Sequence, residues 1–417
     1  MTDSAPNGGR SPEIWVPVPD GSDFPIENLP FGVIAPHEES PRPAIRIGDC
    51  AVDLLRLAQT GALDIPAHIV DQPVLNRLIE SGHAPAVRQQ VSELLAGSAE
   101  PVVEAALHPV ADVQVLLPIR VGDYVDFYSS IHHATNLGRI LRPDSEPLLP
   151  NWRRLPVGYH GRSGTVVVSG TDVERPDGLV AGEDGVPRLM ASRALDIELE
   201  VGFVVGAPGT RIPPDEADGH VFGVVLLNDW SARDIQAYEY QPLGPNLAKS
   251  FATTISPWVV TLDALRPYLM SSPPQDPEPD LYLQAQRPWA LDLNLEVWLN
   301  GERVSATSFG EMYWTFAQQL AHMTVNGATT APGDLYGSGT VSGPSKGERG
   351  SFIELTWRGA EPLHLADGST RTFLLDGDTV VLRGWCGGDG PDRPRIGFGE
   401  AVGTVVPAPA ARTMTGL

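Results

Sequence analysis

Hydrophobic residues occur along this chain mostly in short runs that glycine and proline interrupt. Between residues 20 and 56 such runs predict small strands joined by tight turns. Apolar side chains recur at helical spacing over residues 84–96, which predicts one helix there. Residues 101–120 are interpreted as a linker and an entry strand into the second half. We therefore place a domain boundary near Pro118.

Beyond that boundary, longer apolar runs predict a series of strands. They read GTVVVSG, ALDIELEVGFVVG, VFGVVLLNDW, SPWVVTLD, LDLNLEVWLNG and DTVVLRGW. One helix is predicted to begin at Ser308, because Glu311 follows at the spacing of a capping box. Its expected apolar face is formed by Phe309, Met312, Phe316 and Leu320. Ser271–Tyr282, rich in proline and acidic residues, is expected to be a surface loop.

These patterns predict a mainly β protein with a few helices, of the α+β class. A chain of 417 residues is longer than one hydrophobic core usually serves. We expect a small N-terminal β domain at residues 1–118, mainly structural in role. A larger domain at residues 119–417 is expected to contain the chemistry.

Composition narrows the classes of partner. The formal charge of −23 argues against a nucleic-acid partner, since phosphate backbones bind clustered cations. No apolar run approaches the roughly 20 residues of a membrane span, and residues 1–13 lack the apolar core of a signal peptide. The only cysteines, Cys50 and Cys386, do not suggest a disulfide scaffold. We therefore expect a cytoplasmic protein without membrane or nucleic-acid partners.

Acidic side chains alternate with apolar ones in the segment Ala194–Gly206. In a strand, Asp196, Glu198 and Glu200 would share one face, with neighbours roughly 7 Å apart at Cα. Two interpretations remain open for such a face. It is either an ordinary solvated surface or the holder of a cation that offsets the repulsion of like charges.

Two other carboxylates favour the cation interpretation. Asp229 ends a strongly apolar run, and Asp126 lies among aromatic residues, where a buried carboxylate needs a compensating charge. Several oxygen donors without cysteine, and without a histidine pair at metal spacing, suit Ca²⁺, Mg²⁺ or Mn²⁺ better than Zn²⁺.

Several long segments resemble the fumarylacetoacetase family. They read DFYSSIHHATNLG, LPNWRRLPVGYHGRSGTVVVSG, LDIELEVGFVVG, LNDWSARDIQAYEYQPLGPNLAKSFATTISPWVV, SGTVSGP and RIGFGE. They follow the family order, and the resemblance extends from about Phe31 to Val406. It implies a barrel-like N-terminal domain, a C-terminal mixed β-sandwich or roll, and a homodimer. The loop Arg175–Ser192 departs from the family pattern, so its conformation is left open.

The resemblance also implies roles for individual residues. The expected metal ligands are Asp126, Glu198, Glu200 and Asp229, with Lys249 (through its backbone) and Thr253 at a second cation site; Asp196 is not among them. The expected cofactor is Ca²⁺ or Mg²⁺, or both. His133, rather than the adjacent His132, matches the catalytic histidine, and Glu354 matches its carboxylate partner. The oxyanion donors implied are Arg233, Gln236 and Lys249. The substrate contacts implied are Tyr128, Arg142, Tyr159, Gln236, Tyr240 and Thr340.

The activity implied is metal-dependent hydrolysis of a carbon–carbon bond in 4-fumarylacetoacetate, the last step of tyrosine and phenylalanine catabolism. A neutral histidine oriented by a carboxylate can take a proton from the attacking water. Three alternatives remain. They are another enzyme of the superfamily, such as an acylpyruvate hydrolase; a non-catalytic module that binds through Ca²⁺; and a protein whose acidic residues are merely solvated.

Overall fold

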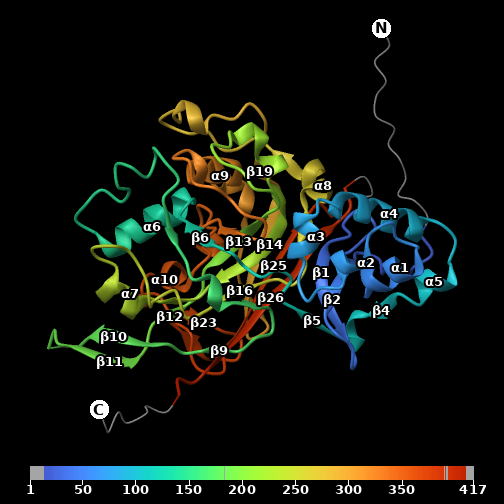
Figure 1. Cartoon of the computed structure of the whole chain (residues 1–417). Coiled ribbons are helices and arrows are strands. Elements are labelled where there is room, and N and C mark those ends of the chain that lie inside the picture. The colour runs from blue at the N-terminus through green and yellow to red at the C-terminus, as the bar shows by residue number, and fades with distance from the viewer. Residues whose placement is uncertain (1–13, 183, 389, 391–392, 410–417) are drawn as a thin grey trace, which may run out of the picture.

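The computed structural model describes residues 14–182, 184–388, 390 and 393–409. Its N-terminal part forms one body beside a larger body built mainly of β-sheet (Figure 1). Strands provide most of the regular structure and helices lie around them. The expected α+β fold is therefore confirmed.

The N-terminal part is a five-stranded antiparallel sheet in the order β4-β3-β2-β1-β5. Its strands are β1 (Phe31–Pro36), β2 (Arg42–Ile47), β3 (Cys50–Asp53), β4 (Leu107–Pro109) and β5 (Val113–Leu116). The helices are α1 (Leu54–Thr60), α2 (Ala67–Val70), α3 (Asn76–Glu80), α4 (Ala84–Ala96) and α5 (Pro101–Glu104). The helix predicted over residues 84–96 is α4, whose apolar side chains are buried.

The interpretation of residues 101–120 as a linker was wrong. Strand β5 pairs with β1, and β4 pairs with β3, so this segment completes the N-terminal sheet. The physical reason is that β1 would otherwise be an edge strand with unpaired backbone groups. The next strand to begin, at Tyr124, belongs to a different sheet.

The larger body contains two main sheets. The first has eight strands, β7-β6-β22-β13-β14-β16-β8 in order, with β17 paired to β14. Its strands are β6 (Tyr124–Phe127), β7 (Gly158–His160), β8 (Val166–Val168), β13 (Leu199–Val205), β14 (Val221–Asp229), β16 (Thr253–Ile255), β17 (Val260–Thr261) and β22 (Leu335–Gly337). The second has five strands, β9 (Val173–Glu174), β20 (Leu293–Leu299), β21 (Glu302–Ser308), β25 (Thr379–Cys386) and β26 (Ile396–Val406), in the order β21-β20-β25-β26-β9.

All seven residues of β13 are buried, because both faces of this strand are covered. Val201, Phe203 and Val205 belong to the core shared with the five-stranded sheet. Val204, on the opposite face, belongs to the core that also contains the N-terminal helices. The N-terminal part thus packs directly on the sheet that carries the acidic residues.

Shorter elements surround the two sheets. The remaining helices are α6 (Ile131–Leu141), α7 (Arg233–Glu239), α8 (Leu262–Leu265), α9 (Phe316–Thr324) and α10 (Phe352–Leu355). The remaining strands are β10 (Asp177–Ala181), β11 (Pro187–Ala191), β12 (Leu195–Asp196), β15 (Ser231–Ala232), β18 (Leu269–Met270), β19 (Ala290–Leu291), β23 (Leu363–His364) and β24 (Thr370–Arg371). Strands β10 and β11 form a projecting hairpin, which gives the loop Arg175–Ser192 its conformation (Figure 1).

The predicted start of the helix at Ser308 was wrong. Residues Phe309–Glu311 form only a 3₁₀ turn, in which Ser308 accepts a hydrogen bond from the Gly310 N–H. Helix α9 begins at Phe316, and its cap residue Thr315, seven residues after Ser308, forms a reciprocal capping box with Gln318. The competing capping pair satisfies two backbone donors at the true start. Within the described residues, no helix is both long and apolar enough to cross a membrane.

Candidate functional site

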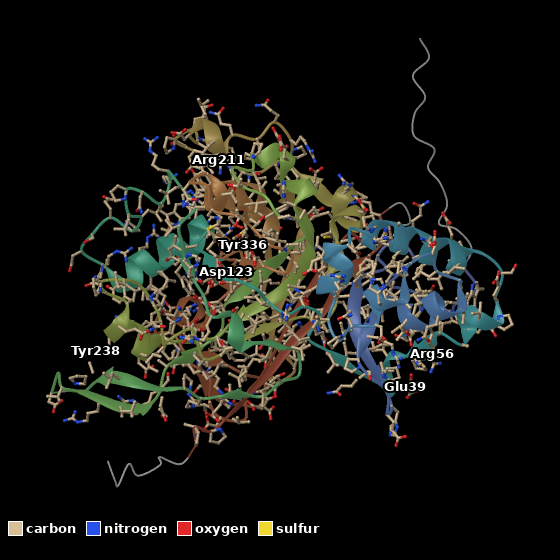
Figure 2. The ribbon with its side chains drawn as sticks, in the orientation of Figure 1. Glu39, Arg56, Asp123, Arg211, Tyr238 and Tyr336 are labelled. Carbon is tan, nitrogen blue, oxygen red and sulfur yellow. The ribbon has the colours of Figure 1, made fainter. Side chains whose placement is uncertain are left out.

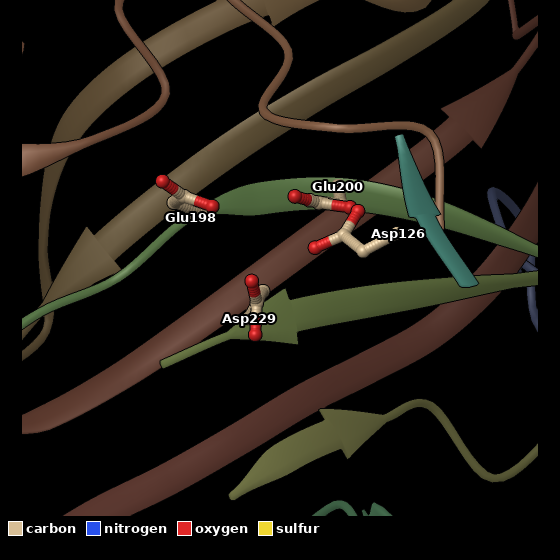
Figure 3. A group of neighbouring side chains, drawn as sticks. All are labelled: Asp126, Glu198, Glu200 and Asp229. Carbon is tan, nitrogen blue, oxygen red and sulfur yellow. The ribbon is translucent and has the colours of Figure 1, made fainter. Parts of the chain in front are cut away.

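Four buried carboxylates converge at one end of the eight-stranded sheet (Figure 3). Each contributes an oxygen atom, and these atoms all lie within 4.8 Å of one another. The four are Asp126, Glu198, Glu200 and Asp229, which we call the acidic cluster. These are the residues expected as metal ligands. The alternative of a solvated acidic surface is wrong, because each of these residues is at most 6% exposed.

The sheet brings these residues together from three distant segments. Glu200 on β13 pairs with Leu227 on β14, the strand that ends at Asp229. Asp126 on β6 pairs with Gly337, whose strand β22 joins β6 to β13. A Cβ atom at Gly337 would lie 2.9 Å from oxygen atoms of both Asp126 and Glu200. Glycine at that position leaves room for the two carboxylates.

The segment Ala194–Gly206 is not one continuous strand. It divides into β12 and β13, because Glu198 forms an isolated bridge with Ser351 instead of extending the ladder. Asp196 consequently does not join the acidic cluster. Its carboxylate binds Arg233 and the backbone N–H groups of Phe352 and Ile353. The exclusion of Asp196 from the expected ligands agrees with this geometry.

The acidic cluster fits a divalent cation with oxygen ligands. Asp126 Oδ1, Glu200 Oε1 and Asp229 Oδ1 are buried and have no hydrogen-bond partner among the described residues. Burial, together with the neighbouring carboxylates, raises the pKa values of Asp126 and Glu200 well above the usual range. A bound cation would remove the cost of ionising these carboxylates. Oxygen donors alone, without thiolate or imidazole, are the set that Ca²⁺ and Mg²⁺ prefer.

Two neighbouring side chains donate to the cluster. The buried ammonium of Lys249 forms ion pairs with Glu198, at 2.5 Å, and with Asp229. Burial raises the pKa of the Glu198 carboxyl, but Lys249 and then Arg233 outweigh this effect and hold that pKa well below its usual range. The Tyr159 hydroxyl lies 2.8 Å from Asp229 Oδ2 and 3.1 Å from Asp126 Oδ2, so its single proton is shared between the two carboxylates.

Arg233, the first residue of α7, is buried beside the cluster. Its Nε donates to Asp196 Oδ2 at 2.8 Å, its Nη1 donates to Gln236 Oε1 at 3.1 Å, and its Nη2 lies 2.8 Å from Glu198 Oε1. Burial lowers the pKa of the guanidinium, but Glu198 and Asp196 more than offset this and raise it.

His133 and Glu354 form a buried pair at the edge of the cluster. His133 Nδ1 lies 2.6 Å from Glu354 Oε2, and His133 Nε2 lies 3.9 Å from Glu198 Oε1. Ser130 caps α6 by accepting from the His133 N–H. The adjacent His132 is instead 31% exposed and 3.8 Å from Glu311. A carboxylate at Nδ1 favours the proton on that nitrogen and leaves the Nε2 lone pair available.

Three further side chains orient Glu354 and were missed from the sequence. Asn136 Nδ2 donates to Oε1 at 2.9 Å, while the hydroxyls of Ser342 and Ser351 donate to Oε2 at 2.9 and 2.7 Å. Burial raises the pKa of Glu354, but His133, Asn136 and Ser351 outweigh this effect and lower that pKa. Asn136 follows His133 by three residues on α6, and this spacing is a signal that could have identified it.

The residues expected to contact substrate are distributed unevenly. The Tyr128 ring meets the His133 ring edge-on, with centroids 5.2 Å apart. Burial raises the pKa of the Tyr128 hydroxyl, and the positive charge of Arg142 acts in the opposite direction. Thr340 is buried and its hydroxyl has no partner among the described residues. The Tyr240 hydroxyl accepts from the Gln241 side chain, and among the described residues it bonds to no member of the acidic cluster. Thr253 pairs with Asp229 across β16 and β14.

A cavity of about 250 Å³ opens beside the acidic cluster. Its lining includes Asp229, Lys249, Tyr159, Arg162 and Asn246. The cavity therefore brings three of the expected functional residues, Asp229, Lys249 and Tyr159, together with an additional arginine. A small, polar or anionic molecule fits this combination of volume and charge.

Comparisons with known proteins bear on the whole chain. The family model described as fumarylacetoacetate hydrolase C-terminal matches residues 124–406, and the model described as fumarylacetoacetase N-terminal matches residues 27–118. The chain is 47% identical over 418 residues to the fumarylacetoacetase of Caenorhabditis elegans, covering 94% of this chain and 99% of that protein. It is 46% identical over 417 residues to the fumarylacetoacetase of Homo sapiens, with the same coverage.

A solved structure gives a comparison of fold alone. The fumarylacetoacetate hydrolase of Exiguobacterium antarcticum aligns with a TM-score of 0.55 and 16% identity. The alignment covers 91% of this chain and 99% of that one. It supports the arrangement of sheets described above.

Proposed function

This chain belongs to the fumarylacetoacetase family, and we propose that its acidic cluster, His133 and Glu354 together hydrolyse 4-fumarylacetoacetate. The products are fumarate and acetoacetate, and the reaction is the last step of tyrosine and phenylalanine catabolism. The enzyme is a hydrolase that acts on a carbon–carbon bond of a ketone. The reaction requires a base that activates a water molecule for attack on the substrate's carbonyl carbon.

His133 is the general base in this proposal. With its Nδ1 proton held by Glu354, its Nε2 takes a proton from water as the water oxygen bonds to the fumaryl carbonyl carbon. The carbon–carbon bond then breaks and its electron pair passes to the acetoacetate fragment as an enolate. The proton on His133 is available to that carbon, so the hydroxyl and the proton of water end in different products.

Negative charge on the carbonyl oxygen requires donors in the intermediate. Arg233 and Lys249 are the buried cations beside the acidic cluster, and Gln236 is bonded to Arg233. We assign these three residues to oxyanion stabilisation. Donors already fixed by neighbouring groups reorganise little when charge develops, which is why one such donor commonly contributes about 10²–10³ in turnover.

Asp126, Glu198, Glu200 and Asp229 would hold the divalent cation, and Lys249 (by its backbone) and Thr253 would serve a second cation site. When bound, Ca²⁺ or Mg²⁺ supplies a Lewis acid that polarises the substrate carbonyls and stabilises the enolate. The buried carboxylate oxygens of Asp126, Glu200 and Asp229 that have no hydrogen-bond partner among the described residues support this assignment. Tyr159 keeps Asp126 and Asp229 in orientation through its hydroxyl.

The substrate's carboxylates are assigned to the remaining polar side chains. Arg142 can bind a carboxylate with more than one N–H group, and Tyr128, Tyr159, Tyr240 and Thr340 offer neutral hydroxyls. Gln236 serves both this role and the oxyanion role. The unpartnered Arg142 Nε and Thr340 Oγ1 support their assignment, since buried donors ordinarily have partners.

Exposed apolar side chains support a homodimer. Leu179 and Leu189 on the β10–β11 hairpin are 46% and 74% exposed, and Leu243 after α7 is 96% exposed. Tyr238 on α7 lies at the outer edge near this hairpin (Figure 2). Apolar patches of this kind commonly mark protein interfaces. We expect light scattering to give about twice the mass of the 44.7 kDa chain.

Two further assignments complete the proposal. We place the boundary between the structural and catalytic domains near Pro118, because the N-terminal sheet ends at Leu116 and the next strand begins at Tyr124. We assign the protein to the cytoplasm, because Cys50 and Cys386 are unpaired thiols of the kind that a reducing compartment maintains.

The observation that carries the proposed function is the His133–Glu354 pair beside the acidic cluster. A module that only binds Ca²⁺ has no need of a buried histidine oriented by a carboxylate. The test is the spectrophotometric loss of 4-fumarylacetoacetate with purified protein. We expect EDTA to abolish turnover and Ca²⁺ or Mg²⁺ to restore it. Full activity in EDTA, or none with either ion, would refute the proposal.

A further inference from the structure

Asp196 is the one acidic residue of its segment that the acidic cluster does not use. It ends β12, is 0% exposed, and accepts four hydrogen bonds. Oδ2 accepts from Arg233 Nε at 2.8 Å and from the Ile353 N–H at 3.0 Å. Oδ1 accepts from the Phe352 N–H at 2.7 Å and from the Ile197 N–H at 2.8 Å. A carboxylate with this many short donors has a fixed orientation.

Three of the four groups that bind Asp196 belong to the two helices that carry the proposed chemistry. Phe352 and Ile353 are the first two residues of α10, and Glu354 is the third. Arg233 is the first residue of α7. One carboxylate therefore joins the helix that presents Glu354 to the helix that presents Arg233, although about 120 residues separate them in the sequence.

Asp196 also determines how Arg233 faces the cluster. Arg233 Nε is bonded to Asp196 and Nη1 to Gln236, so Nη2 is the part of the guanidinium directed at Glu198. Without Asp196 the guanidinium would have no partner at Nε and could rotate toward Glu198. The first turn of α10 would at the same time lose the acceptor of two backbone N–H groups.

We propose that Asp196 is a positioning residue that holds Arg233 and Glu354 in the one arrangement that catalysis requires. This inference rests on the proposed roles of Arg233 and Glu354. In this proposal Asp196 touches neither the attacking water nor the substrate carbonyl. It acts only through Arg233 and Glu354, which it orients. A displacement of about 1 Å in such a site can cost about 10²-fold in rate.

The test compares Asp196→Asn with Asp378→Asn as a matched control. Asp378 is likewise a buried carboxylate, 2% exposed, bonded to an arginine and to a backbone N–H, but it directly precedes β25 and bonds to no member of the acidic cluster. Both substitutions remove one charge and almost no volume. We expect Asp196→Asn to lower kcat by about 10²-fold with KM changed less than threefold. We expect Asp378→Asn to lower the melting temperature while leaving kcat near wild type.

A second readout does not depend on turnover. The 2.6 Å contact between His133 Nδ1 and Glu354 should give a low-field proton resonance in the wild-type protein, assigned by its loss in His133→Asn. Asp196→Asn should shift or broaden this resonance, and Asp378→Asn should leave it in place. An unchanged resonance together with unchanged kcat in Asp196→Asn would overturn the inference.

Two controls keep the outcome interpretable. If Asp196→Asn does not fold, Asp196→Ser, which demands no extra space, is measured with the same expectations and the same overturning result. Wild-type protein that fails to turn over 4-fumarylacetoacetate would refute the proposed function, whereas the resonance would still decide whether Asp196 positions Glu354.

Discussion

The ammonium group of Lys249 lies 2.5 Å from Glu198 Oε2, and both side chains are buried at the edge of the acidic cluster. Lys249 also pairs with Asp229, so it contacts two of the four expected metal ligands. A cation contributed by the protein thus neutralises part of the charge that a divalent ion would balance. Removing the Lys249 ammonium should therefore change the rate of catalysis without weakening metal binding.

Lys249→Met is expected to lower kcat by about 10²–10³-fold, because it removes an oxyanion donor. Ca²⁺ affinity should stay equal or increase, since the repulsion between ammonium and metal is lost while every carboxylate remains. Steady-state kinetics and calorimetric titration with Ca²⁺ measure the two effects. Near-normal turnover, or a large loss of Ca²⁺ affinity, would contradict the assigned role.

Glu354→Gln is expected to lower kcat by about 10²–10⁴-fold. The amide keeps the shape of the side chain but cannot stabilise an imidazolium at His133, and its NH₂ group can face the ring instead of an oxygen. Ser342→Ala removes one of the hydroxyls bonded to the same carboxylate and should have a much smaller effect. Equal kcat values for Glu354→Gln and Ser342→Ala would argue against the pair as the catalytic base.

Glu198→Gln and Glu200→Gln are expected to weaken Ca²⁺ binding at least about 10-fold, because each removes a charged oxygen ligand. In the wild-type protein, Ca²⁺ at 100 times its Kd should stabilise the fold by about 2.7 kcal/mol through mass action. Calorimetry and thermal unfolding with added Ca²⁺ measure both effects. Asp378→Asn is the control and should bind Ca²⁺ as the wild type does. Unchanged affinity in both glutamate variants would exclude them as ligands.

Asp378 is expected to make stability depend on pH in the acid range. Burial raises its pKa, but hydrogen bonds from Arg371 and the Leu375 N–H outweigh this and lower it. Because the folded-state pKa is the lower one, the stabilisation is complete above the unfolded aspartate pKa of about 4 and disappears as pH falls through the folded-state value. The melting temperature of Asp378→Asn should therefore fall less steeply with acidification than that of the wild type. Parallel curves would refute this.

Local patterns in the sequence predicted elements that depend on local interactions. The apolar spacing of Ala84–Ala96 predicted α4 correctly, because packing of one helix face decides that element. The helix start at Ser308 was predicted wrongly. Thr315 and Gln318 have the same capping-box spacing as Ser308 and Glu311, and spacing alone cannot decide which pair caps the helix. The pairing of β5 with β1 joins residues about 80 apart, and no local pattern specifies such a contact.

In the site, too, features set by local sequence patterns were predicted, and features set by contacts between distant residues were not. The alternation of acidic residues indicated Glu198 and Glu200, while family resemblance was needed to connect His133 with Glu354 across 221 residues. Asn136 and Ser342 around Glu354 were missed because their hydrogen bonds exist only after α6 and the loop that carries Ser342 pack against α10. The position of Asp196 depends on a break in the strand at Glu198, which alternation alone does not predict.

The central claim is that His133, oriented by Glu354, activates water beside the acidic cluster. The most direct measurement is single-turnover hydrolysis of 4-fumarylacetoacetate by His133→Asn in saturating Ca²⁺, with Ca²⁺ affinity determined on the same preparation. The account predicts a rate lower by at least about 10²–10⁴-fold and a Ca²⁺ affinity within threefold of wild type, because the ring is a base and not a ligand. A rate within tenfold of wild type would contradict it.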